Sequence, residues 1–266
     1  MSKVFIAHAD GSGRVYPNFP DPELDDWAAA YHAGNYPRLA AVKNAYDPHR
    51  FFDFPKPSNQ QRRRDMSKVF IAHAVSVDGY ISGRTPDGDE EFGRGLGDAP
   101  MLFDWYFDGD TPSQVFDGFK LSEPSARFFD AIAARVGVAV AGRTTYEHSG
   151  HWGGDGPHPT APLFVLSHRP APQISETQTL VTTGIEDAIA AARAAASDKD
   201  VALMGGGVLT SALEADLVDE VILHQVPVLL GAGRSFFHEL PKHVQLRLLE
   251  AIPAPGVTHL HYEVVR

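Results

Sequence analysis

The chain of 266 residues contains no cysteine. This absence excludes disulfide bridges, thiolate metal sites and a cysteine nucleophile, and it fits a reducing compartment. Long apolar runs are also lacking, because none approaches the roughly 20 residues that a helix needs to cross a bilayer. Neither the amino terminus nor any later segment has a signal-peptide pattern. We therefore expect a soluble, cytoplasmic protein.

Basic residues are scarce relative to acidic ones, with 23 Lys and Arg against 34 Asp and Glu. Residues 66–266 hold 14 basic and 26 acidic residues, so the imbalance lies in this part of the chain. An acidic body repels nucleic acid and anionic membranes. We expect neither as a partner and predict a small-molecule ligand. If that ligand is phosphorylated, a few arginines and backbone amides must bind it.

A repeated segment divides the chain. The nine residues Met1–Ala9 (MSKVFIAHA) recur unchanged as Met66–Ala74. The second copy continues into Val75–Tyr80 as a normal domain start would, whereas unrelated sequence follows the first copy. We therefore predict a fused amino-terminal extension, residues 1–65, and one domain, residues 66–266. The second copy is expected in a sheet, and the identical first copy could compete for its place or support strand exchange between chains.

The extension has its own character. Residues 14–54 suggest two short amphipathic helices, and Lys56–Asp65 reads as a polar linker. The segment resembles the carboxyl-terminal tail of berberine-bridge-type FAD-linked oxidases. The matching residues are Tyr16, Asn18, Asn35, Tyr36, Arg38, Leu39, Tyr46, Asp47 and Pro48. In that family the tail packs on a flavin domain, which this chain lacks, so a fused fragment is the expected reading.

Apolar strands alternate with helical segments in residues 66–266. The expected strands are Lys68–Ala74, Gly137–Ala141, Leu163–Ser167, Val201–Met204 and Val218–Val226. Helices are expected from Ser122, from a capping box at Thr183–Glu186 through Ala196, and from Gly205 toward Ala215. Gln245–Glu250 and Val257–Val265 read as a closing hairpin, and Pro86–Ser122 as a long loop. This order predicts a three-layer α/β domain with a mixed, mainly parallel sheet.

Three strand ends carry residues suited to phosphate. The first runs into Gly205-Gly206-Gly207 and then a helix, where glycines let a pyrophosphate approach helix amides. The second ends at Gly142–Thr145, which includes Arg143, and the third at Leu166–Arg169. A tight turn, or a helix cap with a surface arginine, would explain each one separately. Because the three ends meet at one edge of a parallel sheet, together they favour a dinucleotide site.

These motifs are similar in order and spacing to those of the dihydrofolate-reductase-like superfamily, in particular the riboflavin-biosynthesis reductase domain. The markers are Val75–Gly79, Gly142–Glu147, Gly205–Leu209, Asp219-Glu220 and Leu229–Gly233. The resemblance implies a dihydrofolate-reductase-like fold and NADPH as hydride donor. It implies Arg143 and Thr144 at the 2′-phosphate, Gly205–Leu209 at the pyrophosphate and Ser167 near the adenosine. The full implied cofactor set is Ala72, Gly142, Arg143, Thr144, Thr145, Ser167, Gly205, Gly206, Gly207, Val208 and Leu209.

The same resemblance leaves the substrate open. There is no deaminase domain, no cysteine for its zinc site, and no Asp/Pro-rich signature before Gly142. A small heterocyclic or phosphoribosylamino-pyrimidine-like substrate is implied, together with a homodimer to which Val218–Leu230 could contribute. A nucleotide-binding module without turnover is the alternative function. A fragment of a flavin-linked oxidase is a more distant one.

Several residues are candidates for the substrate pocket. Asp78 could have a raised pKa and protonate or orient the substrate, although Asp-Gly is also a common turn pair. The resemblance adds Tyr146. Trp105, with Tyr106, Phe107 and Phe116, could stack on a planar ring or anchor the loop to the core. The group His148, His151 and His158 lacks the spacing of a helical metal pair, so no metal is expected.

Overall fold

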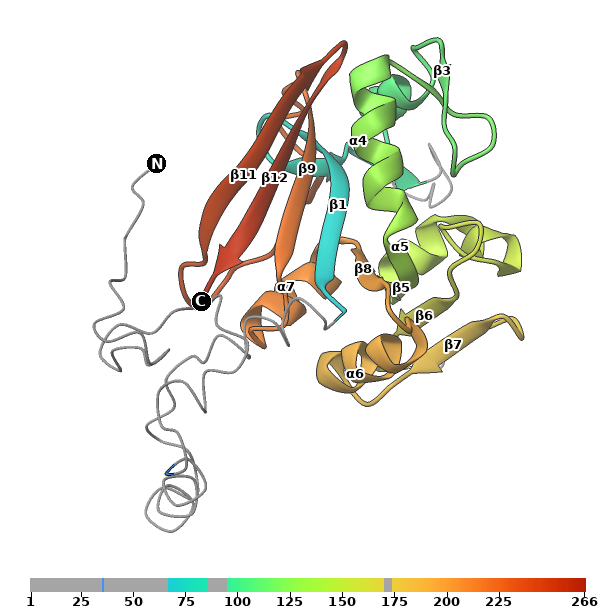
Figure 1. Cartoon of the computed structure of the whole chain (residues 1–266), viewed down its shortest axis with the longest axis vertical. Coiled ribbons are helices and arrows are strands. Elements are labelled where there is room, and N and C mark those ends of the chain that lie inside the picture. The colour runs from blue at the N-terminus through green and yellow to red at the C-terminus, as the bar shows by residue number, and fades with distance from the viewer. Residues whose placement is uncertain (1–34, 36–66, 86–94, 170–173) are drawn as a thin grey trace, which may run out of the picture. The chain divides into compact units, whose positions relative to one another are not determined.

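The computed structural model describes residues 35, 67–85, 95–169 and 174–266. Residue contacts divide the chain into two units, residues 1–66 and 67–266, and the second unit contains the sheet and its helices. The helices and linker predicted for residues 1–65, and the first copy of the repeat, lie outside the described residues. Figure 1 shows the described elements with their labels.

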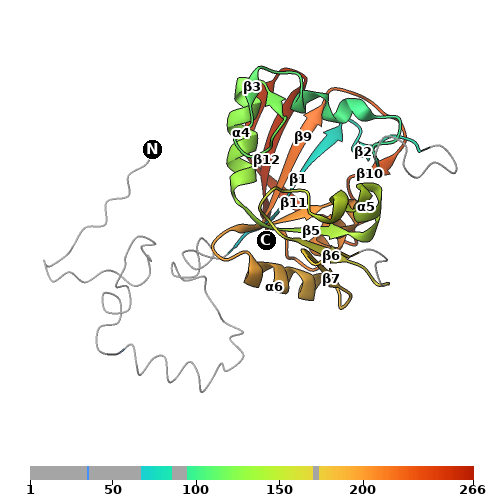
Figure 2. The same ribbon diagram turned by 90° about the vertical axis from the view of Figure 1, so that its right-hand side faces the viewer.

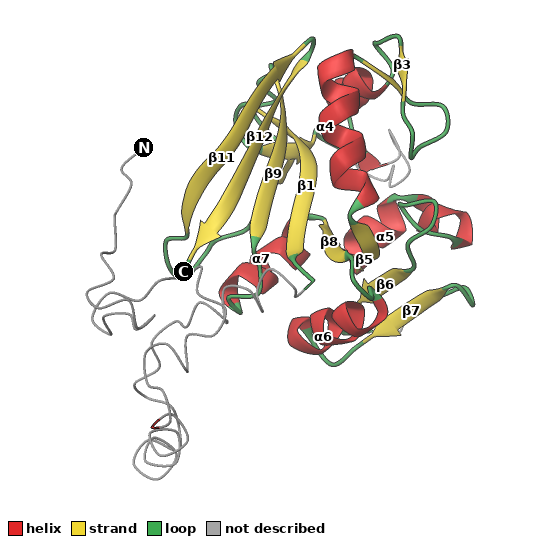
Figure 3. Cartoon of the chain, viewed as in Figure 1, coloured by secondary structure: helices red, strands yellow, loops and turns green. Residues whose placement is uncertain are grey.

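One sheet of eight strands forms the centre of the domain, in the order β11-β12-β9-β1-β8-β5-β6-β7. Every neighbouring pair from β9 to β7 is parallel, whereas β12 runs antiparallel to both β9 and β11. The mixed, mainly parallel sheet and the closing hairpin are therefore as predicted (Figure 3). In chain order the strands are β1 (Val69–Ser76), β5 (Val136–Gly142), β6 (Leu163–Leu166), β7 (Gln178–Val181), β8 (Asp200–Met204), β9 (Glu220–Val226), β11 (Gln245–Ala254) and β12 (Val257–Val265).

Helices cover both faces of this sheet. Side chains alternate between the two faces along each strand, so an apolar strand presents apolar side chains to both. Val69 and Ile71 of β1 pack in a cluster with α6 (Ile185–Ala195) and α7 (Gly206–Glu214). The intervening Phe70 packs on the other face against α4 (Glu123–Ala134). The short α5 (Arg143–His148) lies on the α4 face, where Tyr146 joins a cluster with β5 and β6. The three layers can be followed in Figure 2.

The predicted start of α4 is confirmed, whereas the cap predicted for α6 is wrong. Pro124 lies in the first turn of α4, where its missing N–H costs nothing. The capping box predicted for α6 is wrong, because its N-cap is Gly184 at φ 120° and no side chain caps it. Strand β7 was not predicted, because its four residues carry too little pattern to distinguish it from a loop.

The long segment before α4 is more ordered than its polarity suggested. Where it is described, it contains the 3-10 helix η3 (Pro100–Tyr106) and the small hairpin β3–β4. The strands of that hairpin are Thr111–Pro112 and Lys120–Leu121. A second small sheet pairs β2 (Tyr80–Ser82) with β10 (Arg234–Ser235). A further 3-10 turn, η4 (Gly150–Gly154), follows α5.

The segment Val218–Leu230, which could contribute to a dimer, is part buried and part exposed, with Leu229 73% exposed. Most of it is β9, which lies between β1 and β12, with Val221 and Ile222 buried. The edge strand on this side is β11, where Leu246, Leu248 and Leu249 are exposed.

An ion-pair network stabilises the amino-terminal end of β1 and β9. Glu220 is 2% exposed and pairs with Lys68 at 2.5 Å, Arg135 at 2.8 Å and His261 at 3.0 Å. Burial opposes ionisation of Glu220, but these partners hold its pKa below the usual range. The neighbouring Asp219 accepts a hydrogen bond from Val69 N at 2.9 Å. The Asp219-Glu220 marker is therefore structural in this fold, at the end of the strands opposite the glycine turns.

Candidate active site

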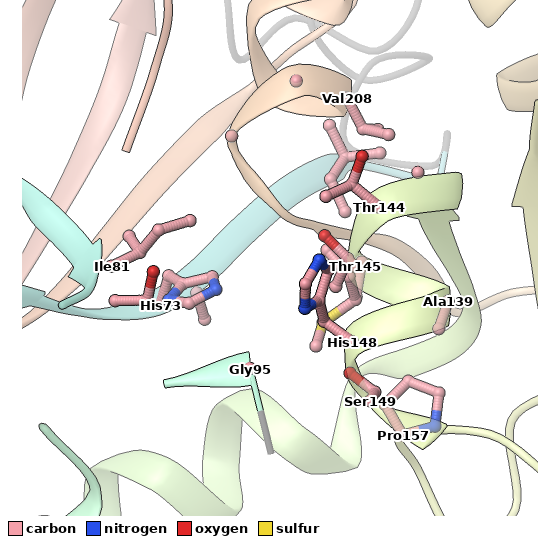
Figure 4. Close-up of a pocket in the computed structure, with 18 of the residues that line it drawn as sticks. His73, Ile81, Gly95, Ala139, Thr144, Thr145, His148, Ser149, Pro157 and Val208 are labelled. Atoms are coloured by element: carbon pink, nitrogen blue, oxygen red, sulfur yellow. The ribbon is translucent and has the colours of Figure 1, made fainter. Parts of the chain in front are cut away.

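A cavity of about 1030 Å³ opens at the carboxyl ends of β1, β8, β5 and β6. These ends meet at one edge because the four strands are parallel and adjacent. The wall also includes parts of η3, α4, α5, α7, β2 and β10. Figure 4 shows the central part, with His73 and Ile81 on one side and Thr145 and His148 of α5 on the other.

The turn from β5 into α5 contributes four of the predicted cofactor residues to this wall, namely Gly142, Arg143, Thr144 and Thr145. The Arg143 guanidinium pairs with Glu147 one helical turn later, Nε to Oε1 at 2.6 Å. This ion pair directs Arg143 along the surface of α5 while its side chain lines the cavity. A Cβ at Gly142 would meet Val208 at 2.9 Å, so the two βα turns are in close contact.

In the glycine turn before α7, some glycines pack against neighbouring elements and others line the cavity. Gly205 has φ +96°, and a Cβ there would lie 2.1 Å from Thr145 Oγ1. Gly206 packs against the backbone of β10, whereas a Cβ at Gly207 would meet nothing closer than His238 Cε1 at 3.8 Å. Gly206, Gly207 and Val208 line the cavity. Gly205 and Leu209 are not among the lining residues, and Leu209 is 1% exposed in the core.

Two further predicted cofactor residues reach the wall from β1 and from the end of β6. Ala72 lines it directly, and Ser167 does so beside Arg169. The Ser167 hydroxyl donates to the Arg169 carbonyl and accepts from the Arg169 amide at 3.2 Å. These bonds fold the chain after β6 into a local turn, which sets the position of Arg169.

Asp78 does not have the raised pKa that was expected of it. Its carboxylate accepts hydrogen bonds from Ser76 Oγ at 2.6 Å, Gly231 N at 2.7 Å and Leu230 N at 3.1 Å. The bond from Ser76 is the largest cause that lowers its pKa, to about 2. The residue is exposed and is not among those that line the cavity. Asp78 is thus an ionised carboxylate that ties the β1–β2 turn to the loop after β9, not a proton donor.

Trp105 and Tyr146, the other two predicted substrate residues, are buried in the core. Trp105 is 3% exposed, and its ring centroid lies 4.8 Å from that of His224 in β9 and 5.1 Å from that of His259 in β12, so it anchors η3 to the sheet. Tyr146 is 0% exposed, and its hydroxyl donates to Gln178 Oε1 at 2.8 Å. Neither side chain lines the cavity. Both are large aromatic residues on elements that border the cavity. Only the direction of the side chain decides whether such a residue contacts a ligand or packs in the core.

Other aromatic residues of the long segment do line the cavity. Tyr106, Phe107 and Phe116 belong to the wall, as do Phe103, Phe119 and Phe129. Tyr106 lies 4.8 Å from Phe119 and 5.3 Å from Phe129 between ring centroids. These rings pack on one another and on the core, and they also line the cavity, so their contact with a planar ligand stays a prediction.

The wall also includes polar residues for which no ligand-binding role was predicted, among them His73, Ser82, Arg234 and His238. His73 Nδ1 lies 2.9 Å from the Ala74 carbonyl, and burial lowers its pKa. The signal for His73 was weak, because a histidine inside an apolar strand reads as core. Arg234 lies in β10, a two-residue strand that has no periodicity to detect.

The charge of the wall is opposite to that of the chain. The net charge is −11, yet the described lining residues include three arginines and no Asp or Glu. The arginines are Arg143, Arg169 and Arg234. A concave surface of this kind attracts anions.

The histidines after α5 do not form a cluster. His158 Nε2 lies 3.1 Å from the Ala133 carbonyl, and the His151 ring packs 4.6 Å from Tyr146 between centroids. Within the described residues no group of three or more His, Asp or Glu side chains is arranged to hold a metal ion. No helix in the same residues combines the length and apolar character needed to cross a membrane.

Comparison with known proteins identifies the family. Residues 67–258 match the family described as RibD C-terminal domain, and the chain belongs to this family. Residues 15–57 match a second family, described as berberine and berberine like. Both resemblances expected from the sequence are thereby confirmed.

Two individual proteins show the extent of similarity. A solved structure from Shewanella sp. PV-4, provisionally assigned to riboflavin biosynthesis, is 26% identical with a TM-score of 0.54. It matches over 76% of this chain and 100% of its own. The uncharacterized protein YwjB of Bacillus subtilis (strain 168) is 29% identical over 128 residues, 48% of this chain and 73% of its own.

Proposed function

We propose that the chain is an NADPH-dependent reductase acting on a small heterocyclic or phosphoribosylamino-pyrimidine-like substrate. The observation that carries the proposal is the wall of the cavity. It combines Arg143, Arg169, two threonines and the glycine start of α7 at one edge of the main sheet, and its described residues include no carboxylate. Phosphate groups are the ligand chemistry that such a wall suits. Membership of the RibD C-terminal domain family supports the same reaction class.

The residues present fit this cofactor at the turn before α7. A Cβ at Gly207 would make only an ordinary contact with the His238 side chain, and the backbone lines the cavity, so a pyrophosphate can approach the first amides of a nine-residue helix. We assign the pyrophosphate to Gly206, Gly207 and Val208, with Gly205 and Leu209 supporting the turn from behind. Gly205 does so through a backbone conformation that favours glycine.

The arginine after β5 suits the phosphate that distinguishes NADPH from NADH. We assign the 2′-phosphate to Arg143 and Thr144, and the adenosine to Ser167 with Arg169 beside it. Gly142, Thr145 and Ala72 complete the cofactor side of the wall. A planar guanidinium gives a phosphate paired N–H donors, and neighbouring hydroxyls add further bonds.

NADPH, when bound, supplies the hydride equivalent. The protein residues bind it, orient the two reactants and exclude water through the aromatic wall. Asp78 takes part as a positioning residue, because its bonds to Leu230 and Gly231 fix the turn beside the cavity.

Consumption of NADPH tests turnover. We expect the purified full chain to oxidise NADPH in the presence of a suitable member of a panel of pyrimidine and pteridine substrates. The absorbance of NADPH gives the rate. NADPH binding without oxidation by any panel member would favour the second candidate, a nucleotide-binding module. The absence of a carboxylate from the described wall is the observation that favours that candidate.

The third candidate, a fragment of a flavin-linked oxidase, relates to residues 15–57 alone. A yellow protein after purification, with a flavin released on denaturation, would support it. We expect a colourless protein.

A further inference from the structure

Arg234 joins two walls of the cavity. It belongs to β10, where it pairs with Ser82 of β2, and it lines the cavity. Its Nη2 atom lies 2.8 Å from Nε2 and 3.1 Å from Nδ1 of His148, the last residue of α5. The guanidinium therefore extends from the β2–β10 sheet to the opposite helix.

Within the described residues, most hydrogen-bond donors of Arg234 have no acceptor. Other arginines pair with carboxylates, such as Arg143 with Glu147 and Arg135 with Asp200. Among the described residues, Arg234 has no carboxylate partner and contacts an imidazole instead. A guanidinium carries five N–H donors, so this contact leaves most of them unused. Arg234 is half-buried, and an anionic ligand would supply the counter-charge that a partly desolvated cation lacks.

A second polar group beside Arg234 is also unused. Ser82 is 2% exposed and lines the cavity, and within the described structure its hydroxyl has no hydrogen-bond partner. Buried hydroxyls are nearly always hydrogen-bonded. Because Ser82 and Arg234 face each other across the β2–β10 pair, their side chains lie on the same face of this small sheet. One anion can accept bonds from both.

This pair lies apart from the residues assigned to the cofactor phosphates. His148 is the last residue of α5 and Arg143 is the first, which separates them by about 7–8 Å along the helix axis. In Figure 4 His148 lies near Gly95, whereas Thr144 and Val208 lie at the other end of the view. A Cβ at Gly95 would meet His148 Cβ at 2.9 Å, which agrees with the picture.

We propose that Arg234 and Ser82, with His148 positioning the guanidinium, bind an anionic group of the substrate, a phosphate monoester or a carboxylate. The aromatic residues of the wall contact the ring to which this group is attached. The proposal rests on the proposed reductase function, since it names the substrate end of the same cavity. Arg234 is thus a specificity-determining residue that separates anionic from neutral substrates.

Calorimetric titration of the full chain with three pyrimidine probes tests this. The probes are uridine 5′-monophosphate, orotate and uridine, each added to protein saturated with NADP⁺ and to protein without nucleotide. We expect at least one anionic probe to bind at least 10-fold more tightly than uridine. Arg234→Ala should abolish this preference, Arg234→Lys should retain part of it, and Ser82→Ala should reduce it.

Arg84→Ala is the matched control, because Arg84 follows β2 but pairs with Asp98 and does not line the cavity. It should keep the preference. Thermal unfolding checks that each variant is folded. The affinities for uridine 5′-monophosphate and for orotate show whether the site prefers a phosphate or a carboxylate.

The other outcomes distinguish failure of the anion subsite from failure of the reductase function. Equal binding of all three probes by the folded wild type, or an unchanged preference in Arg234→Ala, would overturn the proposal while leaving NADPH binding intact. Weaker NADPH binding in Arg234→Ala, without loss of the preference, would assign Arg234 to the cofactor and also overturn it. An Arg234-dependent preference in protein that does not bind NADPH would support the anion subsite and contradict the reductase.

Discussion

Asp78 illustrates how hydrogen bonds determine what a carboxylate can do. Three donors point at it, two of them backbone amides of the loop after β9. They stabilise the ionised form and lower the pKa to about 2. A carboxylate with this pKa does not donate a proton near neutral pH. The fixed charge instead holds together two loops that border the cavity.

The pH dependence of stability tests this role of Asp78. The folded pKa is lower than the usual value of 3.8, so the stabilisation is complete above about 3.8 and is lost as the pH falls toward 2. We expect Asp78→Asn to lower Tm at neutral pH and to flatten the wild-type decline of Tm in that acidic window. Asp117→Asn, an exposed carboxylate elsewhere, is the control. An unchanged profile in Asp78→Asn would contradict the assignment.

At the scale of elements, the glycine turn before α7 separates fold from ligand binding. Gly205 has a backbone conformation that other residues rarely adopt, and a side chain there would clash with Thr145. Gly207, two residues later, lines the cavity, and a side chain there would meet His238 only at an ordinary contact distance of 3.8 Å. The two positions therefore predict different phenotypes for the same substitution.

We expect Gly207→Ala to unfold at nearly the wild-type temperature but to bind NADPH at least about 10-fold more weakly, a loss of roughly 1.4 kcal/mol. Gly205→Ala should lower Tm because of strain and the clash. Thermal unfolding and calorimetric titration measure the two effects. Wild-type affinity in Gly207→Ala would remove the pyrophosphate from this turn.

A buried histidine pair joins β9 and β12. His224 Nδ1 lies 2.8 Å from His259 Nδ1, and His259 Nε2 lies 2.9 Å from Ser125 Oγ. Both side chains are at most 1% exposed. Burial lowers the pKa of His259 to about 4 and that of His224 well below 6.5. Both residues are therefore neutral in the folded protein at neutral pH.

This pair predicts acid sensitivity. The unfolded chain takes up protons near pH 6.5 while the folded chain does not, so stability is complete above that pH and is lost below it. Each histidine contributes a slope of at most about 1.4 kcal/mol per pH unit between pH 6.5 and 4. His259→Phe should reduce the slope of unfolding free energy measured in urea. His243→Gln, at an exposed position, should leave it unchanged, and equal slopes in all three proteins would refute the account.

Much of the fold was predictable because its strands are buried on both faces and read as short apolar runs. β1, β5, β8 and their glycine turns were located in this way, and the strand order places their ends together. Side-chain direction was not predictable, as Trp105 and Tyr146 demonstrate. Arg234 and Ser82 were missed because β2 and β10 are two or three residues long and form through tertiary pairing.

At the scale of the whole molecule, the repeated segment MSKVFIAHA marks the boundary between residues 1–65 and residues 66–266. The second copy supplies β1, the strand between β8 and β9 at the centre of the sheet. The family match begins at residue 67, immediately after the start of that copy. We propose that residues 66–266 form the reductase domain and that residues 1–65 are a fused extension.

Deletion of residues 1–65 should leave the domain folded and able to bind NADPH. The expected change in Tm is less than about 2 °C, which corresponds to under roughly 1 kcal/mol for a domain of this size. Size-exclusion chromatography of both forms checks whether the first copy supports strand exchange. A large loss of Tm in the shortened chain would overturn the fusion interpretation.

The central claim is that the cavity at the carboxyl ends of β1, β8, β5 and β6 binds NADPH, and calorimetric titration tests it most directly. Wild-type protein, Arg143→Ala and Arg127→Ala are titrated with NADPH and with NADH. Arg127 is the matched control, because it pairs with a glutamate four residues away, as Arg143 does, but lies on exposed α4 surface. We predict micromolar NADPH binding, weaker NADH binding, and loss of the NADPH preference in Arg143→Ala alone. Failure of the wild-type protein to bind either nucleotide would contradict the account.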